Sequence, residues 1–274
     1  MTALDERVAL HGYRPDSDRV LAALDLGRLA TATLAEVSAV AALQTRVDRK
    51  YLLDVRAAHV LVERLRSTHH VLGIDGRRSS AYASVYFDSP DWQSFRAHAQ
   101  GRRRRWKIRT RTYLEDDLCR LELKTKDGRG FTVKEALELP ATAFGGLTPE
   151  ARDFLLERAA AQDLQVDVDG LRPGVRIDYA RATLCNLGEA TRLTIDGGLV
   201  ASLGGRVVRM RPDHVLVETK GGLRPSHADR ILLDVGVRPV SVSKYTVAAS
   251  LLEPSLSGHQ WRPTARRFFE RTAA

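Results

Sequence analysis

Cationic side chains recur at every second position of one short segment, residues 107–113. In an extended strand, alternate side chains point to the same face, so Lys107, Arg109 and Arg111 would stand in a row with Tyr113. A guanidinium group can bind two phosphate oxygens at once, and a lysine adds a movable point charge, so such a face suits a chain of phosphates. One alternating charged strand, however, is usually the solvated side of a sheet. The chemistry therefore depends on whether other strands repeat the pattern.

The same alternation returns in further segments of the chain. Each places a cation and an acidic or hydrogen-bonding residue on one face: Arg46, Asp48 and Lys50; Glu122, Lys124 and Lys126; Arg192, Thr194 and Asp196; and Glu218 and Lys220. A sheet with this many charged faces could close into a barrel that holds the charges inside, with an apolar outer face covered by helices. Such an interior would suit a polyanion and a divalent metal ion.

Composition limits the class of protein and of partner. The chain has 274 residues, of which 43% are hydrophobic, and this is enough for a buried core in one large domain or two small ones. Its formal net charge of +9 favours anionic partners such as phosphate chains, nucleotides, nucleic acid or an acidic membrane surface. Cys119 and Cys185 are too few for a disulfide framework and lack metal-ligand spacing, so we interpret both as reduced structural thiols.

No segment of the sequence has the length and apolar character of a membrane span, and the N-terminus does not have the pattern of a signal peptide. We therefore expect a cytoplasmic protein. Its charge would still permit attachment to a membrane through a partner.

The elements that would position the charged faces are strands separated by short helices. Asp54, Ser89 and Thr148 each stand where a helix N-cap is expected, the last two followed by proline, residues 226–236 are predicted to be helical, and a last helix is predicted to start near Lys244. The predicted class is α+β, with a closed antiparallel β-barrel of about eight strands and flanking helices. The predicted strands cover residues 45–53, 79–88, 106–113, 118–126, 130–139, 174–185, 190–199 and 214–220.

Several motifs, taken in order, resemble the polyphosphate polymerase domain of the vacuolar transporter chaperone (VTC) family, which belongs to the triphosphate tunnel metalloenzymes. The resemblance spans roughly residues 44–250. The motifs that carry it are Arg46-Val-Asp-Arg-Lys50-Tyr51, Tyr86-Phe87-Asp88-Ser89, Lys107-Ile-Arg109-Thr-Arg111-Thr-Tyr113, Leu121-Glu122-Leu-Lys124-Thr, Tyr179-Ala-Arg181, Thr191-Arg192-Leu-Thr-Ile-Asp196, Val217-Glu218-Thr-Lys220 and Ser243-Lys244-Tyr245.

The resemblance implies a tunnel in which basic residues hold a triphosphate and acidic residues hold Mn²⁺ or Mg²⁺. It implies Glu218 as the principal metal ligand, with Glu122 and Asp48 as further candidates. Related tunnel enzymes begin with Glu-x-Glu-x-Lys, whereas here Arg46 takes the first acidic position and Asp48 the second. The implied phosphate ligands are Lys50, Arg109, Arg111, Lys124, Arg181, Arg192 and Lys244. Residues that share the inward faces and are predicted to contact substrate are Lys107, Tyr113, Lys126, Lys134 and Lys220.

The function implied by the resemblance is transfer of the terminal phosphoryl group of ATP to a growing polyphosphate chain. A hydrolase of inorganic or nucleoside triphosphates is the nearby alternative, and a non-catalytic module that binds polyphosphate or RNA is the more distant one. ATP or another triphosphate and polyphosphate are the expected partners, with no specific nucleic acid, and export of product would require a separate membrane protein. The basic run at residues 102–105 is either a solvated surface or a site that receives the chain leaving the tunnel.

The expected domain organisation places one catalytic domain between two smaller segments. An N-terminal helical extension would cover residues 1–43, the triphosphate tunnel domain residues 44–255, and a basic C-terminal tail residues 256–274.

Overall fold

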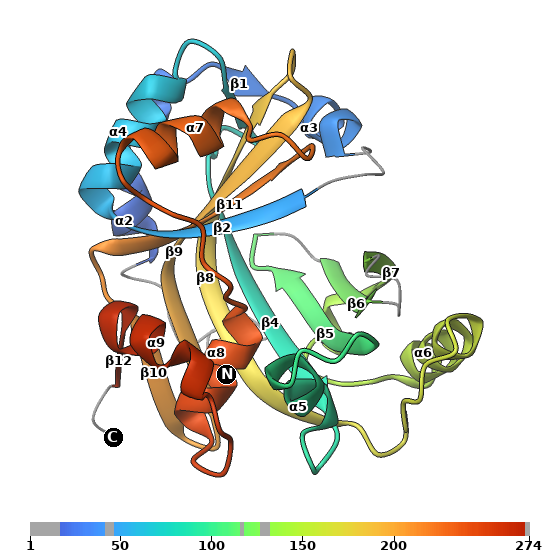
Figure 1. The fold of residues 1–274 in the computed structure, drawn as a ribbon. Coiled ribbons are helices and arrows are strands. Elements are labelled where there is room, and N and C mark those ends of the chain that lie inside the picture. Colours follow the sequence, from blue (N-terminus) through green and yellow to red (C-terminus); the bar gives the residue numbers. More distant parts are fainter. Residues whose placement is uncertain (1–16, 42–46, 116–117, 127–131, 272–274) are drawn as a thin grey trace, which may run out of the picture.

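A twelve-stranded sheet organises the fold (Figure 1). The computed structural model describes residues 17–41, 47–115, 118–126 and 132–271, so the predicted contribution of Arg46 lies outside the described residues. Antiparallel pairing connects the strands in the order β2 (Val47–Asp54), β11 (His214–Gly221), β9 (Thr191–Leu203), β8 (Arg172–Asn186), β4 (Ser80–Asp88), β5 (Arg105–Tyr113), β6 (Leu118–Lys126) and β7 (Thr132–Pro140).

The predicted closed barrel of about eight strands is wrong, because the sheet is open. Among the described residues, β2 pairs with β11 alone and β7 pairs with β6 alone, so no ladder joins the two ends. The sheet is also larger than expected, because the far half of β9 pairs with β10 (Arg206–Met210), which in turn pairs with β12 (Phe269–Arg271). Two short strands, β1 (Thr31–Ala32) and β3 (His70–Leu72), extend it along β8.

The open sheet is nevertheless strongly curved. Register shifts interrupt the β4–β8 and β8–β9 ladders, between Val85 and Phe87 and between Asp178 and Ala180, and such bulges bend a sheet. As a result β6 approaches β2 without pairing with it, and Lys124 Nζ lies 3.9 Å from Asp48 Oδ2. One face of the sheet is therefore concave, and we call it the inner face.

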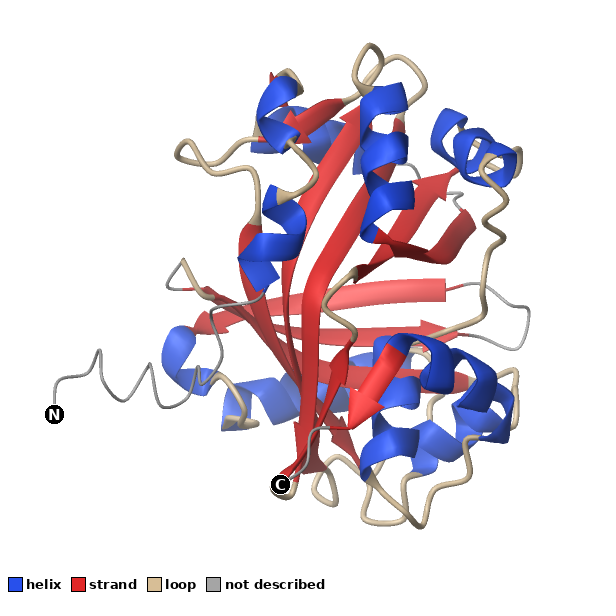
Figure 2. Cartoon of the chain, turned by 90° about the vertical axis from the view of Figure 1, so that its left-hand side faces the viewer, coloured by secondary structure: helices blue, strands red, loops and turns tan. Residues whose placement is uncertain are grey.

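Helices cover the outer face and one end of the inner face (Figures 1 and 2). This arrangement confirms the α+β class with flanking helices. The helices are α2 (Ser17–Ala22), α3 (Leu34–Ala41), α4 (Val55–Leu65), α5 (Gln93–Ala99), α6 (Pro149–Ala161), α7 (His227–Asp234), α8 (Lys244–Leu252) and α9 (Arg262–Phe268), with 3-10 turns η1 (Leu26–Arg28), η2 (Ala141–Ala143) and η3 (His259–Trp261). In the predicted extension at residues 1–43, the described part thus contains two helices and a short strand.

Three large hydrophobic clusters of the described residues hold these layers together, and a fourth, small one joins Ala32, Val37 and Cys185. The first packs α2, α4 and α7 on the outer side of β2, β9 and β11, and Gly197 permits the approach of α2 because a Cβ there would lie 2.9 Å from Val20 Cγ1. The third packs α6 on the outer side of β4, β5 and β6. The second contains Leu52 and Leu216, which are on the inner face, together with Tyr245 and Leu252 of α8. Helix α8 therefore fills one end of the concave side.

Local signals in the sequence set most helix starts. The side chains of Asp54 and Thr148 each accept a hydrogen bond from a backbone N–H in the first turn of α4 and α6, as predicted, and Ser243 caps α8, which starts at Lys244 as expected. Helix α5 begins later than the Ser89-Pro90 signal predicted, at Gln93, because Trp92 adopts a left-handed conformation with φ 61°.

Asp229 connects the strands β2 and β11 to helix α7. Its carboxylate, 1% exposed, accepts hydrogen bonds from Tyr51 Oη at 2.7 Å, Thr219 Oγ1 at 2.6 Å and the backbone N–H of Ser226 at 2.8 Å. Burial alone would raise the pKa of Asp229, but these hydrogen bonds outweigh it and lower the pKa below its ordinary value. The ionised carboxylate therefore stabilises the fold.

Replacement of Asp229 by alanine should lower the free energy of unfolding by about 2–4 kcal/mol at neutral pH, since it leaves buried donors without an acceptor. Because the folded-state pKa is lowered, this contribution is present above the unfolded-state pKa and is lost as the pH falls, so the difference from the parent should shrink in acid. Urea unfolding measures both effects. Asp234→Ala, at an exposed position of the same helix, is the control and should change stability by less than about 0.5 kcal/mol; equal losses in the two variants would contradict the role of Asp229.

Candidate active site on the inner face of the sheet

The strands that line the inner face carry the charges that the sequence pattern placed there. On β2 and β11 the side chains of Tyr51, Leu53 and Val217 belong to the outer core, so the alternate residues Lys50 and Glu218 face inward. The same alternation on β4, β5, β6, β8 and β9 leaves apolar residues in the outer clusters and polar residues inside. The sheet thus brings side chains from distant parts of the chain to one surface.

Glu122 of β6 is the centre of one cluster of charges. It is 3% exposed and accepts hydrogen bonds from Arg109 Nε at 2.7 Å and Lys134 Nζ at 2.8 Å, while Arg111 Nη1 lies 3.9 Å away. Burial alone would raise the pKa of Glu122, but the positive charges of Arg109, Arg111 and Lys134 hold it well below its usual range. Glu122 thus holds the guanidinium groups of Arg109 and Arg111 in position. Lys124, two residues further along β6, lies beside Asp48 and not beside Glu122.

Asp196 of β9 is the centre of a second cluster. It is fully buried and accepts hydrogen bonds from Arg181 Nε at 2.6 Å, Arg181 Nη2 at 2.9 Å and Lys244 Nζ at 2.5 Å. Burial alone would raise the pKa of Asp196, but the charges of Arg181 and Lys244 lower it to about 2. Asp196 was not among the predicted site residues, although it shares the strand face of Arg192.

Glu218 of β11 is the centre of a third cluster, which includes Asp48. Lys220 Nζ donates to Glu218 Oε1 at 2.7 Å, and Lys220 lies opposite Asp48 in the β2–β11 ladder. Burial alone would raise the pKa of Glu218, but Lys220, Lys50 and Lys244 hold it well below its usual range. Glu218 and Asp48 are therefore diagonal neighbours on adjacent strands, with Lys220 between them.

Lys50 and Lys107 each donate a hydrogen bond to a neutral oxygen of the segment before α8. Lys50 Nζ donates to the Val242 carbonyl oxygen at 3.0 Å, and Lys107 Nζ donates to Ser243 Oγ at 2.9 Å. Burial is the largest cause that lowers the pKa of each lysine, and the charge of Lys124 lowers both further. Both ammonium groups could therefore exchange a neutral oxygen for an anionic one.

Tyrosines that were not predicted hold the arginines in place. Arg109 Nη1 donates to Tyr86 Oη at 2.7 Å, and Arg111 Nη2 donates to Tyr179 Oη at 2.8 Å. The Arg181 guanidinium lies over the ring of Tyr179 at 5.3 Å from its centroid, and Lys244 Nζ lies over the same ring at 4.7 Å. For Tyr86, the signal in the sequence was its alternation with the apolar residues Val85 and Phe87 of β4. For Tyr179, it was the position two residues before Arg181 in β8.

The remaining predicted residues lie at the margins of these clusters. Arg192 is opposite Lys220 in the β9–β11 ladder, and Lys126 is opposite Arg105 in the β5–β6 ladder. Tyr113 packs against Tyr82 with ring centroids 4.9 Å apart. Lys124 and Lys134, with side chains 49% and 44% exposed, lie nearest to solvent.

The oxygen donors of Glu218 and Asp48 fit a hard divalent cation, since Mg²⁺ and Mn²⁺ prefer carboxylate and phosphate oxygens. Glu122 is less suited, because Arg109 and Lys134 already occupy its carboxylate. Within residues 17–41, 47–115, 118–126 and 132–271, no group of three or more His, Cys, Asp and Glu side chains could hold a metal ion by itself. A metal ion held by Glu218 and Asp48 would take its remaining ligands from water or from phosphate oxygens of a substrate.

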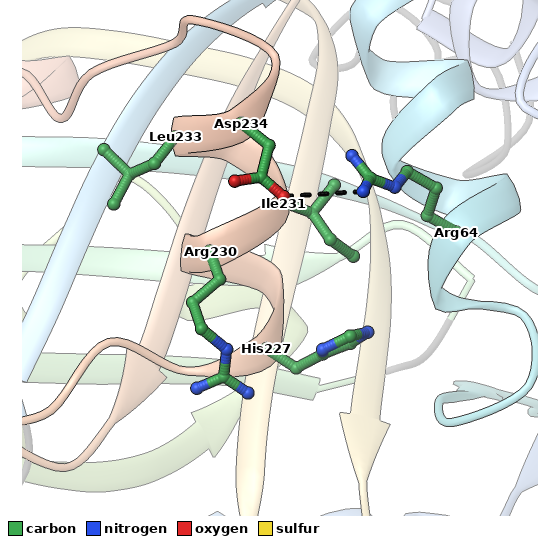
Figure 3. A pocket seen from close by; sticks show the side chains of 6 residues that line it. All are labelled: Arg64, His227, Arg230, Ile231, Leu233 and Asp234. Atoms are coloured by element: carbon green, nitrogen blue, oxygen red, sulfur yellow. Dashed lines mark hydrogen bonds and ion pairs between the residues drawn. The ribbon is translucent and has the colours of Figure 1, made fainter.

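A surface hollow of about 450 Å³ between α4 and α7 is separate from the inner face (Figure 3). It is lined by Arg64, His227, Arg230, Ile231, Leu233 and Asp234. None of these was a predicted site residue. Across it, Arg64 pairs with Asp234 at 3.4 Å, so the cation has a partner within the protein.

In the described part of the chain, no helix is long and apolar enough to cross a bilayer.

Solved structures with a similar course of the chain share little sequence with it. A putative adenylate cyclase from Bacillus halodurans is 17% identical, with 73% of this chain and 94% of that chain covered and a TM-score of 0.47. The putative adenylyl cyclase HpAC1 from Hippeastrum, described as having a dominant triphosphatase activity, is 16% identical, with coverages of 76% and 97% and a TM-score of 0.48. The PH1819 protein from Pyrococcus horikoshii is 13% identical, with coverages of 75% and 96% and a TM-score of 0.42.

No curated protein matches the sequence. The family model of the VTC domain does match, over residues 45–253, which is most of the chain and contains every strand of the inner face. The chain therefore belongs to the VTC domain family.

Proposed function

We propose that this protein is a metal-dependent polyphosphate polymerase, which transfers the terminal phosphoryl group of ATP to a polyphosphate chain on the inner face of the sheet. The observation that carries the proposal is the set of cations gathered there from β2, β5, β6, β8, β11 and α8, within a chain of the VTC family. Phosphoryl transfer requires little covalent help from a protein, because positioning and neutralisation of charge supply most of the rate.

The arginines are suited to the transferred group because they are already oriented. Glu122 and Tyr86 hold Arg109, and Tyr179 with Ser84 Oγ, at 3.3 Å, holds Arg111. A donor that is fixed before the substrate binds loses little conformational freedom when charge develops in the transition state. We assign Arg109, Arg111 and Arg181 to the transferred phosphoryl group and its neighbours.

The lysines are suited to the flanking phosphates of ATP and of the acceptor chain. Besides burial, the charge of Lys124 lowers the pKa of Lys50, and the charges of Lys50 and Lys124 lower that of Lys107, so an anion placed among these lysines relieves repulsion. The terminal oxygen of the chain would attack the γ-phosphorus of ATP, the bond to the β–γ bridging oxygen would break, and ADP would leave. Lys124, Lys126, Lys134, Lys220, Arg192, Lys244 and Tyr113 complete the proposed substrate contacts.

We assign a Mn²⁺ or Mg²⁺ ion to Glu218, with Asp48 as the second carboxylate. When bound, such an ion neutralises phosphoryl oxygens and orients the leaving group. Lys220 lies between these carboxylates, so it would have to exchange its bond to Glu218 for one to substrate.

Incubation of the purified protein with ATP and Mn²⁺, with the products resolved by chain length, tests the proposal. A ladder of polyphosphates with matching release of ADP is expected. Release of inorganic phosphate alone would replace the polymerase by a triphosphatase, with water as the acceptor. Tight binding of polyphosphate without either product would replace the enzyme by a binding module.

Replacement of Glu218 by glutamine should reduce polyphosphate synthesis on the order of 100-fold at saturating metal, because the variant keeps the shape but removes a metal-binding charge. Asp48→Asn should have a smaller effect. Glu138→Gln is the matched control, because this exposed glutamate pairs with Arg120 at 2.6 Å, away from the Glu218 cluster. Synthesis is measured from initial rates, with thermal unfolding to confirm folding; parent-like synthesis by Glu218→Gln would refute the assignment.

Binding of tripolyphosphate at mildly alkaline pH should be accompanied by proton uptake. The pKa of Lys107 is well below its ordinary value in the free protein and should rise beside an anion, so the group gains a proton at any pH between the two values. Calorimetry in buffers of different ionisation enthalpy measures this uptake. Lys107→Arg, which stays charged, should bind with less uptake. Equal uptake by the parent and this variant would exclude Lys107 as the source.

A further inference from the structure

We propose that the protein binds long polyphosphate at a second, external surface, which runs from the start of β5 across α5 to α9. We call it the external basic track and define it by Arg96, Arg102, Arg103, Arg262, Arg266 and Arg267. Its identification with polyphosphate rests on the proposed function, because that function supplies a polyanion longer than the inner face. The α9 part of the track lies outside residues 45–253, which match the family model.

Helix α9 presents an exposed row of arginines without acidic neighbours in the helix. Arg262 and Arg266 are four residues apart and share a helix face, and Arg267 adjoins them; all are exposed. Among the described residues, none of the three forms an ion pair with a carboxylate, and Glu270 is the single acidic residue of segment 262–271. Like charges at this spacing repel one another, so an anion that binds along the row would relieve that repulsion.

Contacts between α5 and η3 place the beginning of α9 beside the end of α5. The rings of Phe95 and Trp261 lie 5.8 Å apart, and Gln260 Nε2 donates to the Ala99 carbonyl oxygen at 3.1 Å. Helix α5 exposes Arg96 on its surface and leads directly into the basic run at residues 102–105.

The basic run in turn reaches the strands of the active site. Arg102 and Arg103 are exposed, and Arg105 Nη1 donates to the Arg102 carbonyl oxygen at 2.5 Å. Arg105 begins β5, where it is opposite Lys126 and two residues before Lys107. Cations therefore continue from the inner face to α9, a path that a linear polyanion could follow.

The chemistry of the track favours an inorganic polyanion over nucleic acid or a membrane. Trp261 and Phe268 are each 7% exposed, and Phe269 and Trp92 are partly buried in the second hydrophobic cluster, so the track offers no fully exposed ring for stacking of bases. The exposed large hydrophobic residues of the described chain are Leu34, Val60, Val133, Leu156, Leu187, Leu223 and Leu233, and none lies in the track, so it has no apolar group for insertion into a bilayer.

The test compares variants in equilibrium binding without ATP, so it does not depend on catalysis. The track variant is Arg262→Gln/Arg266→Gln/Arg267→Gln. The control is Arg56→Gln/Arg64→Gln/Arg66→Gln, which removes the same number of exposed arginines from α4 and its C-cap, in the upper half of Figure 1, whereas α9 lies in the lower half. Each is titrated with a long polyphosphate of defined length and with tripolyphosphate, and thermal unfolding confirms that both variants fold.

We expect the track variant to bind long polyphosphate more weakly by on the order of tenfold, with a salt dependence reduced by about two in log–log slope. Its affinity for tripolyphosphate should equal that of the parent, because a short chain stays on the inner face. Equal affinities of the track and control variants for the long chain would overturn the proposal. If the protein makes no polyphosphate but this difference persists, the proposed function fails and the track stands.

Parallel titrations separate the other anionic ligands. Phosphatidylserine vesicles and a single-stranded RNA of matched charge are each titrated with the parent and the track variant. We expect weaker binding of both than of polyphosphate. Tighter binding of either one, lost in the track variant but not in the control, would assign the surface to that ligand instead.

Discussion

Repulsion among half-buried cations is the constraint on which the inner face depends. Two like charges 4 Å apart at an effective dielectric constant of 20 repel by about 4 kcal/mol, so a row of them is unstable unless anions intervene. Glu122, Asp196 and Glu218 supply these anions, each in contact with a cation from its own or a neighbouring element. Their lowered pKa values follow from this arrangement, because ionisation of each carboxylate is favoured by the cations around it.

The carboxylates neutralise the cations unequally. Arg109 and Arg181 donate to carboxylates that fix their orientation, whereas the hydrogen bonds of Lys50 and Lys107 in the described part of the chain go to neutral oxygens of the segment before α8. An incoming phosphate chain would therefore meet fixed guanidinium groups and displaceable ammonium groups on the same face. A site of this kind rewards ligands with several adjacent negative charges, because a single anion would relieve only part of the repulsion.

Helix α8 links the site to the rest of the fold. Its first residue, Lys244, bonds to Asp196, and the next, Tyr245, stacks on Tyr86 with ring centroids 4.9 Å apart and donates to Asp88. Asp88 also accepts the backbone N–H groups of Ser94 and Phe95 at the start of α5. The position of Arg109, through Tyr86, and the position of α5, which carries part of the external basic track, are thus set by one buried network.

The sequence by itself determined which residues share a strand face, because side chains alternate with period two whatever the partner strand. Lys107, Arg109 and Arg111 could therefore be assigned to one face. The helix starts at Asp54 and Thr148 could also be predicted, because an N-cap depends on neighbouring residues alone. Only the tertiary structure decided which faces meet. Long-range pairing and the bulges in β4 and β8 determined that the sheet stays open and curved, and that Glu122 belongs to Arg109 while Lys124 lies beside Asp48. Local alternation carries no information on strand order or closure, since these depend on contacts between residues far apart in the chain.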